Sequence, residues 1–397
     1  MSPKNSKTAT RLAHGGRATR DHYGFINTPV YRGSTVLFEN SAALKSRDAR
    51  YTYGIHGTPT TDSLADLLTE LEGGVGTVLA PSGLASITTA MLALVKAGDH
   101  VLITDSVYRP TRHFSDTMLT SLGVEIEYYD PLIGADITSL FRDNTRVLFL
   151  EAPGSQTMEI QDIPALTAAA KAHQGERDIF TIVDNTWATA LFFRALDFGV
   201  DITLQAGTKY VGGHSDIMLG AATANERAWP LLKMSHSTLG MCPGTEEVFL
   251  GLRGLRTMQV RMQQHMTAAL KIAEWLRDRP EVSEVLHPGL PGAQGHDIWL
   301  RDFSGSCGLF SIILEPVDEA CVNAFLDELK LFGLGYSWGG FESLAIPFDP
   351  ASYRSATEWK AKGPAIRFHI GLEDPDDLIT DMESGFAKLA QCQNRAQ

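Results

Sequence analysis

The 397-residue sequence has few cysteines, no long apolar run and no excess of positive charge. Its four cysteines, at positions 242, 307, 321 and 392, form no CxxC pair. They therefore offer no metal-ligand spacing and are typical of a reduced cytosolic chain. No segment approaches the roughly 20 apolar residues of a membrane helix. The net charge of −13 argues against a nucleic-acid partner, because phosphates are bound by clustered lysine and arginine.

The first twenty residues carry basic but no acidic side chains, and they lack an apolar segment. A secretory signal needs such a segment, so we do not expect one, whereas a transit-peptide composition stays open. Together with the scattered thiols and the lack of membrane segments, this indicates a cytoplasmic protein.

The length and an ordinary globular composition, with 44% hydrophobic residues, allow two domains with substantial cores. Residues 1–58 are polar and weakly periodic apart from a strand-like stretch at 35–38. We expect them to form an extended arm that lies on another surface, such as a partner subunit. Strand and helix patterns alternate over 59–255, which predicts a mostly parallel sheet with helices on both faces. Over 256–397 the pattern predicts a smaller α+β C-terminal domain.

The alternation of strands and helices over 59–255 predicts where the polar residues after each strand lie. The carboxyl ends of parallel strands meet at one edge of the sheet, where open α/β folds bind their ligands. Because no GxGxxG follows the first strand, a dinucleotide-binding enzyme is disfavoured. The strands are expected at 77–80, 100–104, 124–129, 146–150, 179–183 and 202–204, and the residues that follow them include Gly83, Tyr108, Glu151, Asp184 and Lys209.

Asp184 and Lys209 are the first candidates for chemistry. They follow two buried strands, and the 25 positions between them (209 − 184) suffice for a crossover to a neighbouring parallel strand. An acid and an amine at one sheet edge suit pyridoxal phosphate, whose aldehyde binds a lysine and whose ring nitrogen pairs with an aspartate. Taken alone, a loop-capping aspartate and a solvated lysine explain the same residues.

Two further positions suggest sites for anions. The turn at 81–83 joins a strand to a helix, so free backbone N–H groups and the helix dipole meet there and can bind a phosphate. A simple connecting loop remains an equal alternative. Arg367 lies within an apolar strand pattern, where a guanidinium is costly unless it meets an anion such as an amino-acid carboxylate.

Four stretches carry a resemblance to a known family. The chain is similar to the Cys/Met-metabolism family of pyridoxal-phosphate enzymes over nearly its whole length, with the motifs in the family's order. The resemblance implies a seven-stranded, mostly parallel sheet like that of other pyridoxal-phosphate-dependent transferases. The stretches are YTYGIHGTPTTDSL (51–64), DNTWATALFFRALDFGVDITLQAGTKYVGGHSD (184–216), GYSWGGFESL (335–344) and IRFHIGLED (366–374).

The resemblance implies catalytic roles for Lys209, Tyr108 and Tyr53. Lys209 binds the cofactor, takes the proton from the α-carbon of the substrate and protonates the departing sulfur. Asp184 pairs with the ring nitrogen of the cofactor. Tyr108 stacks on the ring, although a half-buried core tyrosine would look the same in the sequence.

Further implied contacts hold the cofactor phosphate. Backbone N–H groups of Gly83 and Leu84 bind it, helped by Thr208. The family usually has a hydroxyl three residues before the lysine, and this chain has Ala206 there. One side-chain contact to the phosphate is therefore in question.

The resemblance also concerns the arm and the second domain. Tyr53 and the residue at position 55, usually arginine, reach the phosphate bound by a neighbouring subunit, but this chain has Ile55. We expect either that His56 compensates in part or that it is an ordinary surface histidine. Ser337 and Trp338 resemble the residues beside the substrate carboxylate, although Trp338 also fits a core position.

The activity implied is α,β-elimination from a sulfur amino acid, converting cystathionine and water to homocysteine, pyruvate and ammonia in methionine biosynthesis. The alternatives are γ-elimination or γ-replacement, a broader β-lyase acting on cysteine conjugates, and a non-catalytic protein that keeps the fold. The substrate is a small molecule, no metal, membrane or nucleic acid takes part, and the implied assembly is a homotetramer made of two active dimers.

Overall fold

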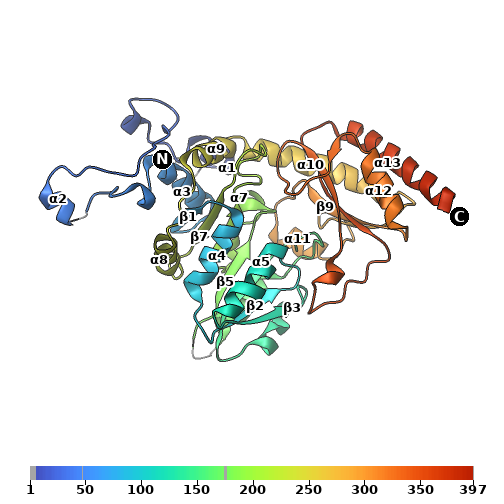
Figure 1. Ribbon diagram of the computed structural model, residues 1–397, viewed down its shortest axis with the longest axis horizontal. Coiled ribbons are helices and arrows are strands. Elements are labelled where there is room, and N and C mark those ends of the chain that lie inside the picture. Colours follow the sequence, from blue (N-terminus) through green and yellow to red (C-terminus); the bar gives the residue numbers. More distant parts are fainter. Residues whose placement is uncertain (1–5, 47, 174–176, 397) are drawn as a thin grey trace.

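The computed structural model describes residues 6–46, 48–173 and 177–396. Parts of the expected arm (1–5 and 47), of the large domain (174–176) and of the C-terminal domain (397) lie outside the described residues. In Figure 1 the arm extends at the left, the sheet with its helices forms the centre, and the C-terminal part lies at the right in orange and red.

The described residues form a central seven-stranded sheet in the order β1-β7-β6-β5-β4-β2-β3. All strands run parallel except β7, which is antiparallel to β1 and β6, so the prediction of a mostly parallel sheet is confirmed. The sequence analysis missed β7, because its residues, GAATA, lack the large apolar side chains of a typical buried strand. The strands are β1 (Gly76–Ala80), β2 (His100–Thr104), β3 (Glu125–Tyr129), β4 (Thr145–Glu151), β5 (Phe180–Asp184), β6 (Ile202–Ala206) and β7 (Gly220–Ala224).

Both faces of this sheet are buried, as the apolar strands require. Successive residues of β4 alternate between two cores: Leu148 and Leu150 belong to the core that includes α3 and α6, while Val147 and Phe149 belong to the core that includes α4 and α8. The helices are α1 (Thr8–His14), α2 (Ser41–Ser46), α3 (Pro59–Glu72), α4 (Gly83–Leu94), α5 (Arg109–Phe114), α6 (Ile163–Ala172), α7 (Thr189–Phe192), α8 (Trp229–Leu239), α9 (Thr245–Leu255), α10 (Met258–Arg277), α11 (His296–Asp302), α12 (Glu319–Glu328) and α13 (Pro375–Ala396).

The C-terminal part contains a second sheet and a core of its own. Within the described residues this sheet has five strands in the order β10-β11-β12-β9-β8. Side chains of α10, α12 and α13 cover one face of this sheet, where they form a core with Ile366, Phe368 and Ile370. The strands are β8 (Val282–Leu286), β9 (Leu309–Leu314), β10 (Phe332–Gly333), β11 (Ser343–Phe348) and β12 (Ala365–His369).

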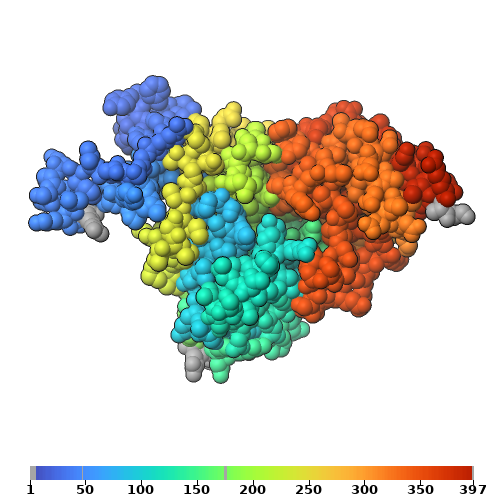
Figure 2. Space-filling view, viewed as in Figure 1, coloured from blue at the N-terminus to red at the C-terminus, as the bar shows by residue number. Residues whose placement is uncertain are grey.

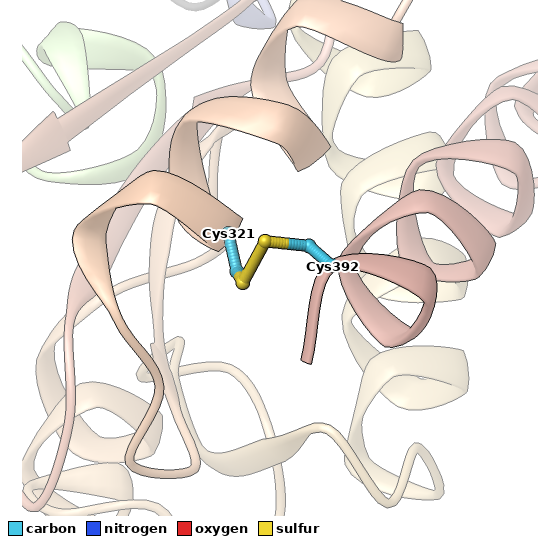
Figure 3. Close-up of a disulfide and its surroundings, with 2 residues drawn as sticks. All are labelled: Cys321 and Cys392. Carbon is cyan, nitrogen blue, oxygen red and sulfur yellow. A yellow bond between two sulfur atoms is a disulfide. The ribbon is translucent and has the colours of Figure 1, made fainter. Parts of the chain in front are cut away.

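A disulfide between Cys321 on α12 and Cys392 on α13 links two helices of this core (Figure 3). The expectation that all cysteines are reduced was therefore wrong for this pair. The two residues lie 71 positions apart, and their sequence gives no spacing that identifies a pair. None of the helices within the described residues is both long and apolar enough to cross a membrane. A cytoplasmic location stays a prediction.

A loop of the C-terminal part returns to the central sheet and fixes the two parts together. The buried carboxylate of Asp105 accepts hydrogen bonds from the three backbone N–H groups of residues 355–357, at 2.8–3.1 Å. Arg354 lies beside them and donates to Glu159 at 2.7 Å. Figure 2 shows the orange C-terminal surface against the central body. These contacts hold one part rigidly against the other next to the carboxyl edge of the sheet.

The N-terminal segment begins on the body of its own chain and then leaves it. Leu12 of α1 is buried in the core beside α3. Farther along, Tyr23, Phe25 and Leu37 are 97%, 70% and 90% exposed, and Figure 1 shows this segment extending away from the body. The strand expected at 35–38 was wrong: the segment forms an isolated bridge between Thr35 and Tyr53.

Candidate active site

A cavity of about 330 Å³ lies at the carboxyl edge of the central sheet, where the C-terminal part meets it. The ends of β4, β5 and β6 contribute Glu151, Asp184 and Ala206, and Lys209 follows β6. Arg367 of β12 lines the opposite wall. The parallel strands therefore bring these side chains to one place, and the second sheet closes the cavity.

Asp184 ends β5 and is held by the residues that follow it. The backbone N–H and the hydroxyl of Thr186 donate to its Oδ1 at 3.0 and 2.6 Å. Burial raises the pKa of Asp184, while the bonds from Thr186 and the charge of Lys209 act in the opposite direction. A cation in the cavity would favour the ionised carboxylate in the same way as Lys209 does.

Lys209 presents a partly neutral amine. Burial and then the charge of Arg367 lower the pKa of Lys209 to about 8, while Asp184 opposes them. The Nζ donates to Ser337 Oγ and lies 5.3 Å from the centre of the Trp338 ring. An amine with this pKa exchanges a proton readily near neutral pH, as a general base and acid must.

Arg367 is buried and holds its charge without an anion. Its side chain is 7% exposed, and burial lowers the pKa of Arg367 to about 10. It donates from Nη2 to Ser337 O at 2.9 Å. Within the described residues it forms no ion pair and its Nε lacks a partner. A buried guanidinium with free donors is suited to a carboxylate from outside the chain.

The N-terminus of α4 presents backbone N–H groups that could hold a phosphate. In the part of the chain that the structure describes, the N–H groups of Gly83 and Leu84 have no acceptor, and Ser82 caps the helix by accepting from Ala85 N at 3.0 Å. A Cβ at Gly83 would lie 2.7 Å from Cβ of Ala206, so glycine is required for this close approach. Together with an amine at Lys209, these groups fit pyridoxal phosphate.

Thr208, the expected side-chain ligand of the phosphate, lines the cavity but is also engaged with the backbone. Its hydroxyl accepts from Leu219 N at 3.0 Å and donates to Leu219 O at 3.2 Å. The hydroxyl can turn its proton toward an anion while it keeps the bond from Leu219 N. The family usually has a second hydroxyl at position 206. This chain has Ala206 there, which adds only a methyl group to the wall of the cavity.

Tyr108 lies at the start of α5, and its backbone is fixed by Glu151. The N–H of Tyr108 donates to Glu151 Oε2 at 2.7 Å. Glu151 pairs in register with Asp184 on the neighbouring strand. Burial, and then the charge of Asp184, raise the pKa of Glu151 well above its ordinary value. Glu151 therefore holds a proton more readily than an exposed glutamate does.

The structure brings most of the expected site residues together. Tyr53 and His56 are the exceptions, since they lie on the arm and line no part of the cavity of their own chain. Ser337 contacts the site through its bond from Lys209. The expected residues that line the cavity are Gly83, Leu84, Tyr108, Asp184, Thr208, Lys209, Trp338 and Arg367.

Thr186 was not predicted, and Glu151 was predicted at this edge but without its contact. Thr186 orients Asp184 and also accepts from Ala206 N at 2.9 Å, which connects the ends of β5 and β6. A hydroxyl two residues after an aspartate is a common turn pattern, so the sequence carried a weak signal. Glu151 was expected at this edge, but no pattern in the sequence indicated its bond to Tyr108.

The geometry of the described residues does not indicate a metal centre. Across residues 6–46, 48–173 and 177–396, no three or more histidine, cysteine, aspartate or glutamate side chains form a group that could hold a metal ion.

The chain is similar to known proteins over almost its whole length. The model of a family described as Cys/Met metabolism PLP-dependent enzyme matches residues 9–387. A putative cystathionine β-lyase of Rhizobium johnstonii is 51% identical over 97% of each chain. Cystathionine β-lyase MetC of Escherichia coli is 43% identical over 97% of this chain and 99% of its own. The structure of a cystathionine γ-synthase from Xanthomonas oryzae pv. oryzae has a TM-score of 0.88 and 28% identity, covering 97% of this chain and 99% of that one.

The bond between Glu151 and Tyr108 allows a test of whether the charge of Glu151 is needed. We expect Glu151→Gln to bind pyridoxal phosphate within about threefold of the parent, because the amide keeps an uncharged acceptor for Tyr108 N–H. Glu151→Ala leaves that N–H without its acceptor and is expected to weaken binding by roughly 5- to 150-fold. Fluorescence titration of the cofactor-free chains measures both, and thermal unfolding controls for folding. Equal losses in the two variants would mean that the charge of Glu151 is needed.

Proposed function

Since the chain belongs to the Cys/Met metabolism family of pyridoxal-phosphate-dependent enzymes, we propose that it cleaves the Cβ–S bond of cystathionine. The resemblance seen in the sequence, the cofactor and the carbon–sulfur lyase class are thereby confirmed. The proposed reaction converts cystathionine and water to homocysteine, pyruvate and ammonia. The observation that carries it is the amine of Lys209, with a pKa of about 8, between Arg367 and Asp184 in one cavity.

Lys209 moves the protons in the proposed mechanism. Its neutral amine takes the proton from the α-carbon of the substrate and then delivers a proton to the sulfur that leaves from the β-carbon. When bound, the cofactor supplies an electron sink for the pair of electrons left on the α-carbon. The lowered pKa of Lys209 allows both transfers near neutral pH.

Arg367, Ser337 and Trp338 orient the substrate. The free donors of Arg367 bind the α-carboxylate, which replaces the missing anion of a buried guanidinium. Ser337 holds the amine of Lys209 by its hydroxyl, and Trp338 covers that amine from one side. The α-carbon of a bound amino acid is thereby placed next to Nζ.

Asp184, Tyr108 and the start of α4 hold the cofactor. The carboxylate of Asp184, oriented by Thr186, pairs with a protonated ring nitrogen. The ring of Tyr108 covers one face of the cavity, and the N–H groups of Gly83 and Leu84 bind the phosphate, with Thr208 beside them. These roles follow from position and chemistry, and they agree with those implied by the resemblance.

The comparisons support β- over γ-cleavage. The two relatives with 51% and 43% identity carry the name cystathionine β-lyase, whereas the γ-synthase structure is 28% identical. γ-Elimination and γ-replacement remain the alternatives within the family, and both leave the lysine and its partners unchanged. The keto acid that is released distinguishes them.

We further infer that a second copy of the chain completes each site. The arm exposes apolar side chains that a partner surface would bury, among them Tyr23 (97% exposed), Phe25 (70%) and Leu37 (90%). In this arrangement Tyr53 and His56 reach the cavity of the neighbouring chain, which gives a homodimer as the smallest active unit. Two such dimers form the proposed tetramer.

In the proposed dimer, the cofactor phosphate lacks an arginine contact at position 55. Ile55 takes the position at which the family's arginine meets the phosphate of the neighbouring subunit. In this chain His56 supplies the nearest replacement, since it carries a donor one residue farther along. The phosphate is then held mainly by the N–H groups of α4.

Product analysis tests the reaction. We expect the purified, yellow protein to release pyruvate and homocysteine in equal amounts from cystathionine, and Lys209→Ala to lose at least about 10³-fold in kcat because it removes the amine that lines the cavity. Borohydride should abolish the visible band of the parent. Release of 2-oxobutyrate would show γ-cleavage, and a colourless protein without products would favour a non-catalytic binding role.

Mixed dimers test the contribution of the arm. Lys209→Ala and Tyr53→Ala chains are each expected to be strongly impaired. In a mixed dimer one of the two cavities combines an intact Lys209 with an intact Tyr53 from the neighbour. Coexpression should therefore restore roughly a quarter of parental activity, since half of randomly formed dimers are mixed. No recovery would mean that Tyr53 does not act across an interface.

Restoring the arginine tests the phosphate contact. Ile55→Arg is expected to lower the Kd for pyridoxal phosphate by roughly 5- to 150-fold, about 1–3 kcal/mol, because it adds a cation opposite a dianion. His56→Ala should weaken binding if His56 compensates. Equilibrium dialysis of the cofactor measures both variants. An unchanged Kd for Ile55→Arg would show that position 55 does not reach a phosphate.

A further inference from the structure

The turn formed by residues 337–340 is strained and lies directly against Lys209. Ser337 has φ +78° and Gly339 φ +87°. A left-handed backbone at a non-glycine residue such as Ser337 is costly and persists only when its surroundings hold it. A Cβ at Gly339 would lie 3.0 Å from Cα of Lys209. The conformation of this turn therefore decides where the partners of the lysine lie.

Two of the contacts that hold the turn come from residues with other tasks. Lys209 donates to Ser337 Oγ, and Arg367 donates to Ser337 O at 2.9 Å. Under the proposed function, Lys209 exchanges its partners during the reaction and Arg367 binds the substrate carboxylate. Neither residue can hold the turn alone throughout the cycle.

A further contact comes from His369, which has no such task. Its Nε2 lies 3.1 Å from Gly339 N and 3.2 Å from Gly340 O. The residue is fully buried on β12, on the same face of the strand as Arg367 because strand side chains alternate. In either tautomer the ring is hydrogen-bonded to the backbone of the turn.

His369 is itself held in place from behind. Its ring packs 5.2 Å from that of His265 and 6.0 Å from that of Tyr210. His265 donates from Nδ1 to Ile370 O at 2.8 Å, which fixes α10 to the end of β12. Burial lowers the pKa of His369 well below its ordinary value, so its ring stays neutral and keeps its bond to the turn.

We propose that His369 is a positioning residue that keeps the 337–340 turn, and with it Ser337 and Trp338, in place beside Lys209 while Lys209 and Arg367 change partners. The proposal deepens the proposed function and rests on it. A core histidine without this task would stabilise the fold and leave the site unaffected.

Two substitutions separate the hydrogen bond from simple packing. Gln places an amide at the position of Nε2, whereas Asn reaches only the position of Nδ1. We expect His369→Gln to keep KM for cystathionine within about threefold of the parent and His369→Asn to raise it by roughly tenfold or more. Acrylamide quenching of Trp338 fluorescence, taken as the difference from a Trp338→Phe holoenzyme, should rise in the Asn variant alone.

His287 provides the matched control, since it is also buried and accepts from a backbone N–H, that of Gly289, at 3.0 Å through Nδ1. His287→Gln loses that bond and should lower Tm without changing KM or the quenching of Trp338. The proposal is overturned if both variants of His369 behave like the parent, or if Gln is as impaired as Asn. A parent chain without lyase activity refutes the proposed function instead, and the quenching comparison still reports on the turn.

Discussion

The site depends on the burial of one amine between two charges of opposite sign. Burial and Arg367 lower the pKa of Lys209 to about 8, and Asp184 limits that decrease. Without burial the amine would stay protonated at neutral pH, and without Asp184 the cavity would lose the carboxylate that Thr186 orients. The strands that precede Asp184 and Lys209, and the helix that begins at Gly83, hold the charged groups of the site in position.

The residues of the site come from both the central sheet and the C-terminal part of the chain. The central sheet contributes the acid, the amine and the start of α4, whereas Arg367 and Trp338 come from the C-terminal part. Trp187 donates to Leu309 O at 3.0 Å and Tyr210 accepts from Gly308 N at 3.0 Å, so the two parts are hydrogen-bonded close to the cavity. The loop bound by Asp105 adds a second anchor. A site built across such a junction is held in place because hydrogen bonds cross the junction at several points.

The sequence predicted the parts of this arrangement that follow from local pattern. Buried strands with polar exits placed Asp184 and Lys209 at one edge, because parallel strands end together. The strand β7 escaped prediction since its small side chains give no strand signal. The contacts of Glu151 and Thr186 depend on the register between strands, and the Cys321–Cys392 bond depends on how two helices pack. The roles of Tyr53 and His56 concern a second copy of the chain, and they stay predictions.

Helix α13 has a consequence for the order in which the two parts fold during translation. α13 supplies Leu378, Met382, Phe386 and Leu389 to the C-terminal core, and it carries Cys392 of the disulfide. The ribosome covers the newest residues of a growing chain, so this core cannot close until residues 375–396 have been made. The central sheet can fold earlier, with its lysine exposed to solvent. A cofactor that arrives at this stage meets only the central-sheet side of the cavity, and Trp338 and Arg367 complete the lining once the C-terminal part has folded.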